Sequence, residues 1–154
     1  MVTGGASGIG KAISETFAKK GVTVAIADLQ KDAAQDLASK VGNSSTAHVC
    51  DVTNLDSIKS AVAEVIAAHG RIDILINSAG IVALAPAELL EKSAWDLTMN
   101  VNLSGTFFMS QTVGKHMLER GQGKIINLAS QAASIALDEH VAYCASKFGV
   151  LGIT

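Results

Sequence analysis

The stretch TGGASGIG, from Thr3 to Gly10, separates a short apolar start from a segment with helical periodicity. Glycines allow backbone conformations that other residues rarely adopt, and the free N–H groups at a helix N-terminus favour negative charge. The spacing is G-x3-G-x-G, so the more familiar G-x-G-x-x-G dinucleotide pattern is not matched. By itself the stretch fits either a phosphate-binding turn or a plain tight turn.

Short apolar runs alternate with helix-period segments along the rest of the chain. Three of these runs are continuous enough for burial on both faces of a sheet. The runs that we predict as strands are VTVAIAD (22–28), TAHVC (46–50), DILINS (73–78) and KIINLAS (124–130). Gly21 and Gly70 stand where helices between them should end. The alternation is typical of successive βαβ units, so we predict an α/β fold with a parallel sheet.

The segment from Ser93 to Arg120 is apolar on more than one side. A helix that covers one face of a sheet needs only one apolar stripe. The excess predicts an interface between copies of the chain, in a homodimer or a homotetramer.

The composition narrows the functional classes. The chain has 154 residues, of which 49% are hydrophobic and 17% charged, which is enough apolar material for one domain over residues 1–154. The net charge is −2, and no basic run exceeds Lys19–Lys20, so we expect no nucleic-acid partner. No stretch is apolar for long enough to cross a membrane, and no basic leader begins the chain, which predicts a cytoplasmic protein without a membrane partner.

The metal-ligating residue types are sparse. Cys50 and Cys144 are far apart in sequence, which favours reduced, buried thiols over a disulfide framework or a zinc site. The histidines show no ligand-like pairing, so we expect no metal. They are His48, His69, His116 and His140.

Asp28 ends the predicted strand 22–28, which is the second apolar run of the chain and follows the glycine-rich turn. A carboxylate at this place can accept hydrogen bonds from the ribose hydroxyls of an adenosine and would repel a 2′-phosphate. No arginine neighbours Asp28, which favours NAD over NADP. The alternative is a solvated loop acid.

Several further motifs stand in one order along the chain, and with them the sequence resembles the short-chain dehydrogenase/reductase family from Thr3 to its last residue. They are the turn Thr3-Gly4-x3-Gly8-x-Gly10, the segment Asn77-Ser78-Ala79-Gly80, VNLSG around Asn102, NLAS ending at Ser130, and Tyr143-x3-Lys147. Ser78 replaces the second asparagine of the family's Asn-Asn-Ala-Gly segment. The resemblance implies a Rossmann-type, doubly wound parallel sheet with helices on both faces.

The resemblance also implies site residues, including Asp51 and Val52 as contacts to the adenine. The catalytic set that it implies is Asn102, Ser130, Tyr143 and Lys147. The cofactor-binding set is Gly4, Ser7, Gly8, Ile9, Gly10, Asp28, Asp51, Val52, Asn77, Ala79, Gly80, Tyr143 and Lys147.

The chemistry expected of this set is hydride transfer between a nicotinamide cofactor and a secondary alcohol or ketone. Tyr143 and Lys147 are four residues apart, so their side chains share one face of a helix, and the lysine cation favours the tyrosine phenolate. Tyr143 is therefore the expected acid and base, and Lys147 also holds the cofactor ribose. Ser130 would hydrogen-bond the reacting oxygen, and Asn102, by resemblance, would hold a water that links Lys147 to solvent.

Gln131 and His140 suggest the substrate. An amide and an imidazole can each hydrogen-bond a hydroxyl beside the reacting carbon. The stretch ASQAASIALDEHVAYCASK resembles the sugar-alcohol and xylulose-reducing members of the family, so we favour a polyol or ketose. Alternatively, Gln131 caps a loop and His140 only starts the last helix. The other substrate classes that remain are a 3-oxoacyl thioester and a steroid-type ketone.

Two non-enzymatic alternatives also remain, a regulator that binds NAD without turnover and an inactive fragment. Only Met1 and Val2 precede Thr3, which is short for a strand, and the chain ends on apolar FGVLGIT. We expect an incomplete first strand and the absence of the family's lid region, which follows the point where this chain ends.

Overall fold

In the computed structural model, which describes residues 1–154, five strands form one sheet in the order β3-β2-β1-β4-β5. All neighbouring strands run parallel, which confirms the predicted parallel sheet. The strands are β1 (Val2–Thr3), β2 (Ala25–Asp28), β3 (Thr46–Val49), β4 (Ile74–Asn77) and β5 (Lys124–Asn127).

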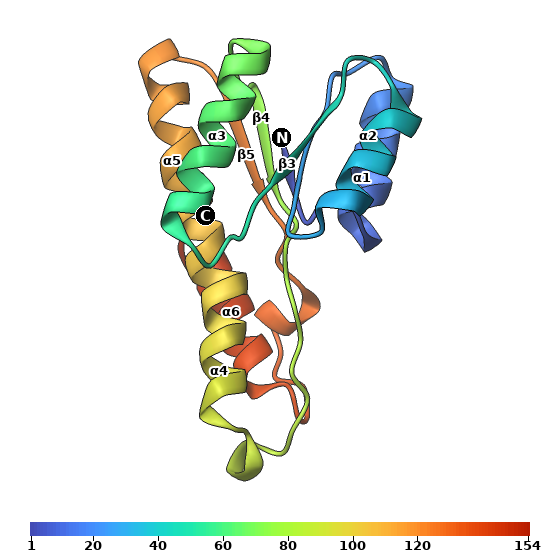
Figure 1. The fold of residues 1–154 in the computed structure, drawn as a ribbon. Coiled ribbons are helices and arrows are strands. Elements are labelled where there is room, and N and C mark those ends of the chain that lie inside the picture. Colours follow the sequence, from blue (N-terminus) through green and yellow to red (C-terminus); the bar gives the residue numbers. More distant parts are fainter.

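Helices cover both faces of this sheet, as the doubly wound prediction requires. The first two helices lie on one face and the third and fifth on the other, while the fourth and sixth lie together beyond the carboxyl ends of the strands (Figure 1). The helices are α1 (Gly8–Lys19), α2 (Lys31–Val41), α3 (Leu55–His69), α4 (Lys92–Met99), α5 (Thr106–Arg120) and α6 (Val141–Gly152). None of them combines the length and the hydropathy that crossing a membrane requires.

The side chains of β2 divide between two buried cores. Ala25 and Ala27 belong to the core that packs under α3 and α5. Ile26, together with Val24 just before the strand, belongs to the core under α1 and α2. This alternation follows from the two-residue period of a strand, and it explains why β2 reads as a continuous apolar run.

The burial predicted for three of the strands is wrong in part. β2 is buried throughout and β4 nearly so, whereas β5 is largely exposed, with Ile125 at 36% and Ile126 at 46% exposure. The reason is position in the sheet, because β3 and β5 are its outer strands. The strands are also shorter than the apolar runs from which they were predicted.

The helix ends were predicted more closely. Gly70 follows α3 directly and adopts the left-handed conformation, with φ of 77°. α1 ends just before Gly21, whose φ of 79° also lies in the glycine-favoured region.

The long apolar segment forms α4 and α5 joined by η2 (Asn100–Gly105), a wide π-helical turn. Some of its apolar residues are exposed, which agrees with the prediction that one face of the sheet cannot cover them all. Trp95 is 37% exposed, Leu97 52%, Phe107 42% and Leu118 83%.

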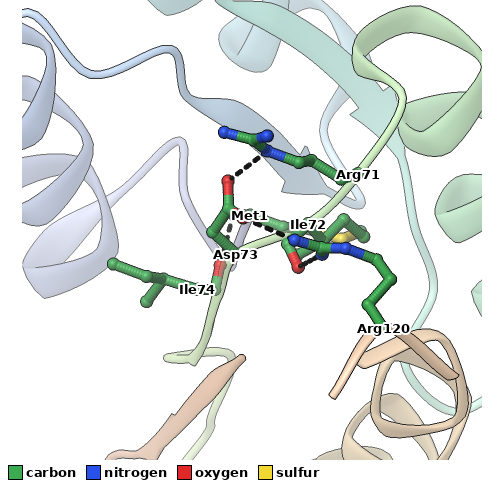
Figure 2. Close-up of polar contacts among 6 residues, drawn as sticks. All are labelled: Met1, Arg71, Ile72, Asp73, Ile74 and Arg120. Carbon is green, nitrogen blue, oxygen red and sulfur yellow. Dashed lines mark hydrogen bonds and ion pairs between the residues drawn. The ribbon is translucent and has the colours of Figure 1, made fainter. Parts of the chain in front are cut away.

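A charged cluster ties α5 to the amino end of β4 (Figure 2). Arg120 donates from Nη1 to the carbonyl oxygen of Ile72 at 3.0 Å and from Nη2 to Oδ1 of Asp73 at 2.9 Å. Arg71 donates from Nε to Oδ2 of the same carboxylate at 3.1 Å, and the Met1 ammonium donates to the Ile74 carbonyl oxygen at 2.8 Å. The Arg120 hydrogen bond, supported by Arg71, holds the pKa of Asp73 below its usual range.

Candidate active site at the carboxyl ends of β1 and β4

The chain order places a crevice between two neighbouring strands. β2 and β3 lie to one side of β1, and β4 and β5 to the other, so the direction of winding reverses between β1 and β4. Ligands of open α/β sheets bind outside the carboxyl ends of the strands at such a point. The Thr3 hydroxyl at the end of β1 accepts from the backbone N–H groups of Ser78 (3.1 Å) and Ala79 (3.2 Å) after β4. The glycine turn and the segment after β4 are thereby held together.

Glycine is required in the turn for two different reasons. Gly4 has φ of 59°, and a Cβ there would lie 2.9 Å from Cα of Ala79. A Cβ on Gly10 would lie 2.2 Å from the carbonyl oxygen of Gly4, closer than any real contact. At Gly8 the requirement is conformational, since φ is 49° and the space around it is open.

That open space adjoins the start of α1. Ser7 precedes the helix and its side chain makes no capping hydrogen bond, while Ile9 in the first turn is 67% exposed. No side chain caps the first N–H groups of α1. They can therefore donate hydrogen bonds to a negatively charged phosphate.

Asp28 is buried and is not the solvated loop acid of the alternative interpretation. It is 9% exposed. Its Oδ2 accepts from the backbone N–H of Ala6 at 3.0 Å, and its Oδ1 accepts from that of Gln30 at 3.0 Å. Each carboxylate oxygen has a further lone pair, so the same group that holds the glycine turn can also accept from a ribose hydroxyl.

Asp51 and Val52 follow the end of β3, beside Asp28. The backbone N–H of Cys50 donates to the Asp28 carbonyl oxygen at 2.9 Å, which joins the two strand ends. Asp51 accepts at Oδ1 from both the N–H (2.9 Å) and the hydroxyl (2.7 Å) of Thr53. Val52 packs under η2, where a Cβ on Gly105 would approach it to 3.0 Å.

The segment after β4 brings the glycine turn next to the predicted catalytic residues. Asn77 is buried and donates from Nδ2 to Oγ of Ser110 at 2.9 Å and to Oδ1 of Asn127 at 2.8 Å. A Cβ on Gly80 would lie 3.4 Å from Oδ1 of Asn102 and 3.7 Å from Nζ of Lys147. Glycine at this position leaves the lysine open toward the turn.

Tyr143 and Lys147 lie on the same side of α6. Nζ of Lys147 is 5.7 Å from the centroid of the Tyr143 ring and donates to the carbonyl oxygen of Leu128 at 2.6 Å. Lys147 is 6% exposed, and this burial lowers its pKa because an ammonium group loses hydration there. A half-buried phenol thus stands beside a buried amine at the carboxyl end of the sheet.

The other predicted substrate-side residues lie around this pair with different degrees of contact. Ser130 accepts at Oγ from the N–H of Ala132 at 3.1 Å, so Ser130, rather than Gln131, caps the short helix η3 (Gln131–Ala133). Gln131 is exposed. His140 immediately precedes α6 without a side-chain capping bond, and its ring centroid lies 6.2 Å from that of Tyr143. No hydrogen bond joins Ser130 to Tyr143 in this structure.

Asn102 is fully buried in η2, and its amide is engaged by protein atoms. Nδ2 donates to the Ile81 carbonyl oxygen at 2.9 Å and to Oγ of Ser146 at 3.0 Å, while Oδ1 accepts from the Ile81 N–H at 2.8 Å. Sequence reasoning missed these partners and Leu128. Ile81 and Leu128 contribute only main-chain atoms, which leave no signal in the side-chain pattern. Ser146 had a signal, since it lies between Tyr143 and Lys147.

Two structural features lie away from this site. His48 and His69 share the Thr46 hydroxyl, at 2.7 and 2.8 Å from Nε2 of each ring, a pairing that the sequence pattern did not indicate. No three histidine, cysteine or acidic side chains converge on a possible metal position. A cavity of about 660 Å³ lies at the amino end of the sheet near Val24 and Ile72, opposite the crevice between β1 and β4.

The chain belongs to the short-chain dehydrogenase family, whose sequence profile, described as short chain dehydrogenase, matches residues 1–154. It is 55% identical over 157 aligned positions to a D-threitol dehydrogenase of Mycolicibacterium smegmatis, covering 100% of this chain and 60% of the relative. It is 48% identical over 155 positions to an NAD-dependent glycerol dehydrogenase of Listeria innocua, covering 100% of this chain and 61% of the relative. The chain thus spans about 60% of the length of these curated relatives.

The fold has a close counterpart among solved structures. The sorbitol-6-phosphate 2-dehydrogenase of Erwinia amylovora superposes with a TM-score of 0.96 at 31% sequence identity, over 99% of this chain and 62% of that one. The Rossmann-type fold implied by the motifs is therefore confirmed.

Proposed function

We propose that residues 1–154 form the cofactor-binding and catalytic domain of an NAD-dependent dehydrogenase that interconverts a polyol and the corresponding ketose. The observation that carries the proposal is the placement of Tyr143 and Lys147 together on α6, beside Gly80 and the glycine turn. The names of the two curated relatives support a polyol as the substrate class.

The residues of the crevice fit a dinucleotide. The open space at Gly8 and the first N–H groups of α1 would take the pyrophosphate, Asp28 the adenosine ribose, and Asp51 and Val52 the adenine edge. Asn77, Ala79 and Gly80 would line the cofactor on the β4 side. When bound, the nicotinamide supplies the hydride acceptor or donor, and no metal is required.

Proton transfer is the task of Tyr143. In oxidation its phenolate oxygen takes the proton of the substrate alcohol, and in reduction its hydroxyl returns a proton to the carbonyl oxygen. Lys147 stabilises the phenolate and hydrogen-bonds the cofactor ribose, for which its ammonium group has two N–H donors besides the one that the Leu128 carbonyl oxygen accepts. Ser130 hydrogen-bonds the reacting oxygen. Asn102 anchors η2, and its Oδ1, which accepts only from the Ile81 N–H and has a second lone pair, would hold a water beside Lys147.

Asp28 supports NAD over NADP, because its carboxylate would lie against a 2′-phosphate and repel it. Its neighbours reinforce the preference, since no arginine adjoins it in sequence. The word NAD in the name of the Listeria relative points the same way.

Gln131 and His140 would select the substrate. His140 stands beside the Tyr143 ring, so its imidazole can hydrogen-bond a hydroxyl next to the reacting carbon. Gln131 follows Ser130 directly, and its exposed amide is available for a second hydroxyl. A substrate without these hydroxyls would leave both groups unpaired.

The exposed apolar residues of α4 and α5 support a homodimer or homotetramer. Leu97, Phe107 and Leu118 are each more than 40% exposed on this helical segment. Burial of such side chains between copies is favourable, and sedimentation velocity of the purified protein would report the assembly.

Initial-rate assays test the proposed activity. NADH or NADPH formation is followed with threitol, glycerol and sorbitol, beside a simple secondary alcohol and a hydroxyacyl thioester. We expect turnover of a polyol with NAD. Turnover of the thioester alone would instead assign an acyl-thioester reductase, and NAD binding without any turnover would assign a regulator.

The variant Tyr143→Phe supplies the matching control. We expect it to lose about 10²- to 10⁴-fold in kcat, because the proton acceptor is removed. Its affinity for NADH, measured by fluorescence titration, should stay within about twofold, because the ring is retained. Activity equal to that of the unmodified protein would contradict the role of Tyr143.

A further inference from the structure

Ser146 lies between Tyr143 and Lys147 on α6, and its hydroxyl is engaged on two sides. Its Oγ donates to the main-chain carbonyl oxygen of Tyr143 at 2.7 Å and accepts from Nδ2 of Asn102 at 3.0 Å. Ser146 and Asn102 are both completely buried. A serine that only bonds back to its own helix needs no second partner, whereas this hydroxyl joins α6 to η2.

The Asn102 amide extends the link to a third segment. Its other N–H and its oxygen are hydrogen-bonded to the backbone of Ile81, in the loop that follows Gly80. Ser146, Asn102 and Ile81 therefore fasten α6, η2 and the loop after β4 to one another. Each of these segments contributes to the crevice.

The packing beside Ser146 leaves little freedom for α6 to move. Gly149, one turn further along, faces Leu103 of η2, and a Cβ there would lie 2.7 Å from Cδ2 of that leucine. The hydroxyl of Ser146 and the glycine thus lie along one side of α6 against the same turn. A shift or rotation of α6 would break the hydrogen bond.

We propose that Ser146 is a positioning residue, which holds the first turns of α6 against Asn102 and so sets the place of the Tyr143 phenol relative to the bound substrate. The inference rests on the proposed function. Ser146 touches neither cofactor nor substrate and acts through the backbone of Tyr143.

The test compares Ser146→Ala with a matched control, Ser110→Ala. Ser110 on α5 likewise accepts from an asparagine amide, that of Asn77 at 2.9 Å, and donates to a carbonyl oxygen of its own helix, that of Thr106 at 2.7 Å. For Ser146→Ala we expect kcat to fall about ten- to hundredfold while KM for NAD stays within about twofold, because only the phenol is displaced. For Ser110→Ala we expect kcat at saturating NAD within about twofold of the unmodified protein, because its partner Asn77 lies on the cofactor side and keeps its hydrogen bond to Asn127 at 2.8 Å.

A graded variant keeps the test decisive if Ser146→Ala does not fold. Ser146→Cys retains a side chain of similar shape with a weak donor and acceptor, so its kcat should lie between those of the unmodified protein and Ser146→Ala. A kcat of Ser146→Cys equal to the unmodified value, with Ser146→Ala equal to Ser110→Ala where it can be measured, would overturn the proposal.

Amide hydrogen exchange separates this inference from the proposed function. If the unmodified protein turns over none of the substrates, the proposed function fails, and the link is tested by exchange in residues 141–147. Faster exchange there in the Ser146 variants than in Ser110→Ala supports the link between α6 and η2, and equal exchange overturns it.

Discussion

At the scale of single residues, Asp28 has a structural role beside the recognition role that we propose for it. Both carboxylate oxygens already accept backbone N–H groups, one from the glycine turn and one from the start of the segment before α2. The negative charge is thus fixed in place before any ligand binds, so the proposed rejection of a 2′-phosphate would need no rearrangement.

Replacing the acid with its amide should change cofactor preference. For Asp28→Asn we expect the ratio of kcat/KM with NADP to that with NAD to rise roughly tenfold, because the repulsive charge is removed. The comparison is made by initial rates at saturating polyol. Asp32→Asn, which removes an exposed acid in the first turn of α2, should leave the ratio unchanged. An unchanged ratio in both variants would mean that Asp28 does not read the ribose.

At the scale of elements, the glycine turn shows why residue type and spacing matter together. Position 10 requires glycine because a side chain would clash with the Gly4 carbonyl oxygen, and position 8 requires it because φ is positive. Both glycines shape the same turn. The absence of a side chain at Gly10 lets the start of α1 lie against the end of β1, while the open space at Gly8 faces the crevice.

A methyl group at the contact position should disturb both stability and binding. We expect Gly10→Ala to lower the free energy of unfolding by about 3 kcal/mol or more, because the clash is with backbone that cannot rotate away. Gly114→Ala is the matched control, since its Cβ would make only an ordinary contact of 3.8 Å and alanine favours a helix interior by about 0.5–1 kcal/mol. Urea unfolding and NADH titration measure both effects. Equal stability of the two variants would contradict the close contact.

The sequence predicted the elements better than the contacts between them. The parallel, doubly wound sheet follows from the alternating elements and the family motifs, and Gly70 marked the end of α3. The outer position of β5, and with it the exposure of Ile125, depends on which strands neighbour it, which an apolar run does not record. The sequence also did not predict the hydrogen bonds of Asn102 to the Ile81 backbone, because main-chain partners carry no residue-specific pattern.

At the scale of the whole molecule, the two ends of the sheet carry different structural features. The carboxyl end carries the crevice, while the amino end carries the Arg71–Asp73–Arg120 cluster (Figure 2) and the cavity of about 660 Å³. Substitutions in the cluster should therefore affect stability without affecting chemistry.

Arg120 allows that separation to be measured through pH. The lowered pKa of Asp73 means that its contribution to stability is present above the ordinary aspartate value of 3.8 and is lost as pH falls through the lower folded value. Arg120→Gln should lower the free energy of unfolding near neutral pH by up to about 1 kcal/mol, since both groups are partly exposed and screened.

That difference should shrink as the pH falls through the lowered folded pKa of Asp73, because the carboxylate then loses its charge. Urea unfolding at about pH 7 and about pH 2.5 provides the comparison, and kcat should be the same for both proteins at neutral pH. A stability difference that is equal at the two pH values would contradict a contribution from the Asp73 charge.

The central place of β1 also constrains the order of events during synthesis. β1 pairs with β2 and with β4, whose partner residues Ile76 and Asn77 come more than 70 positions after β1. At about 5–20 residues per second, the ribosome makes β4 several seconds after β1. Until then the Thr3 hydroxyl lacks the N–H groups of Ser78 and Ala79, so the crevice between β1 and β4, where we propose that NAD binds, forms only after β4 has been made.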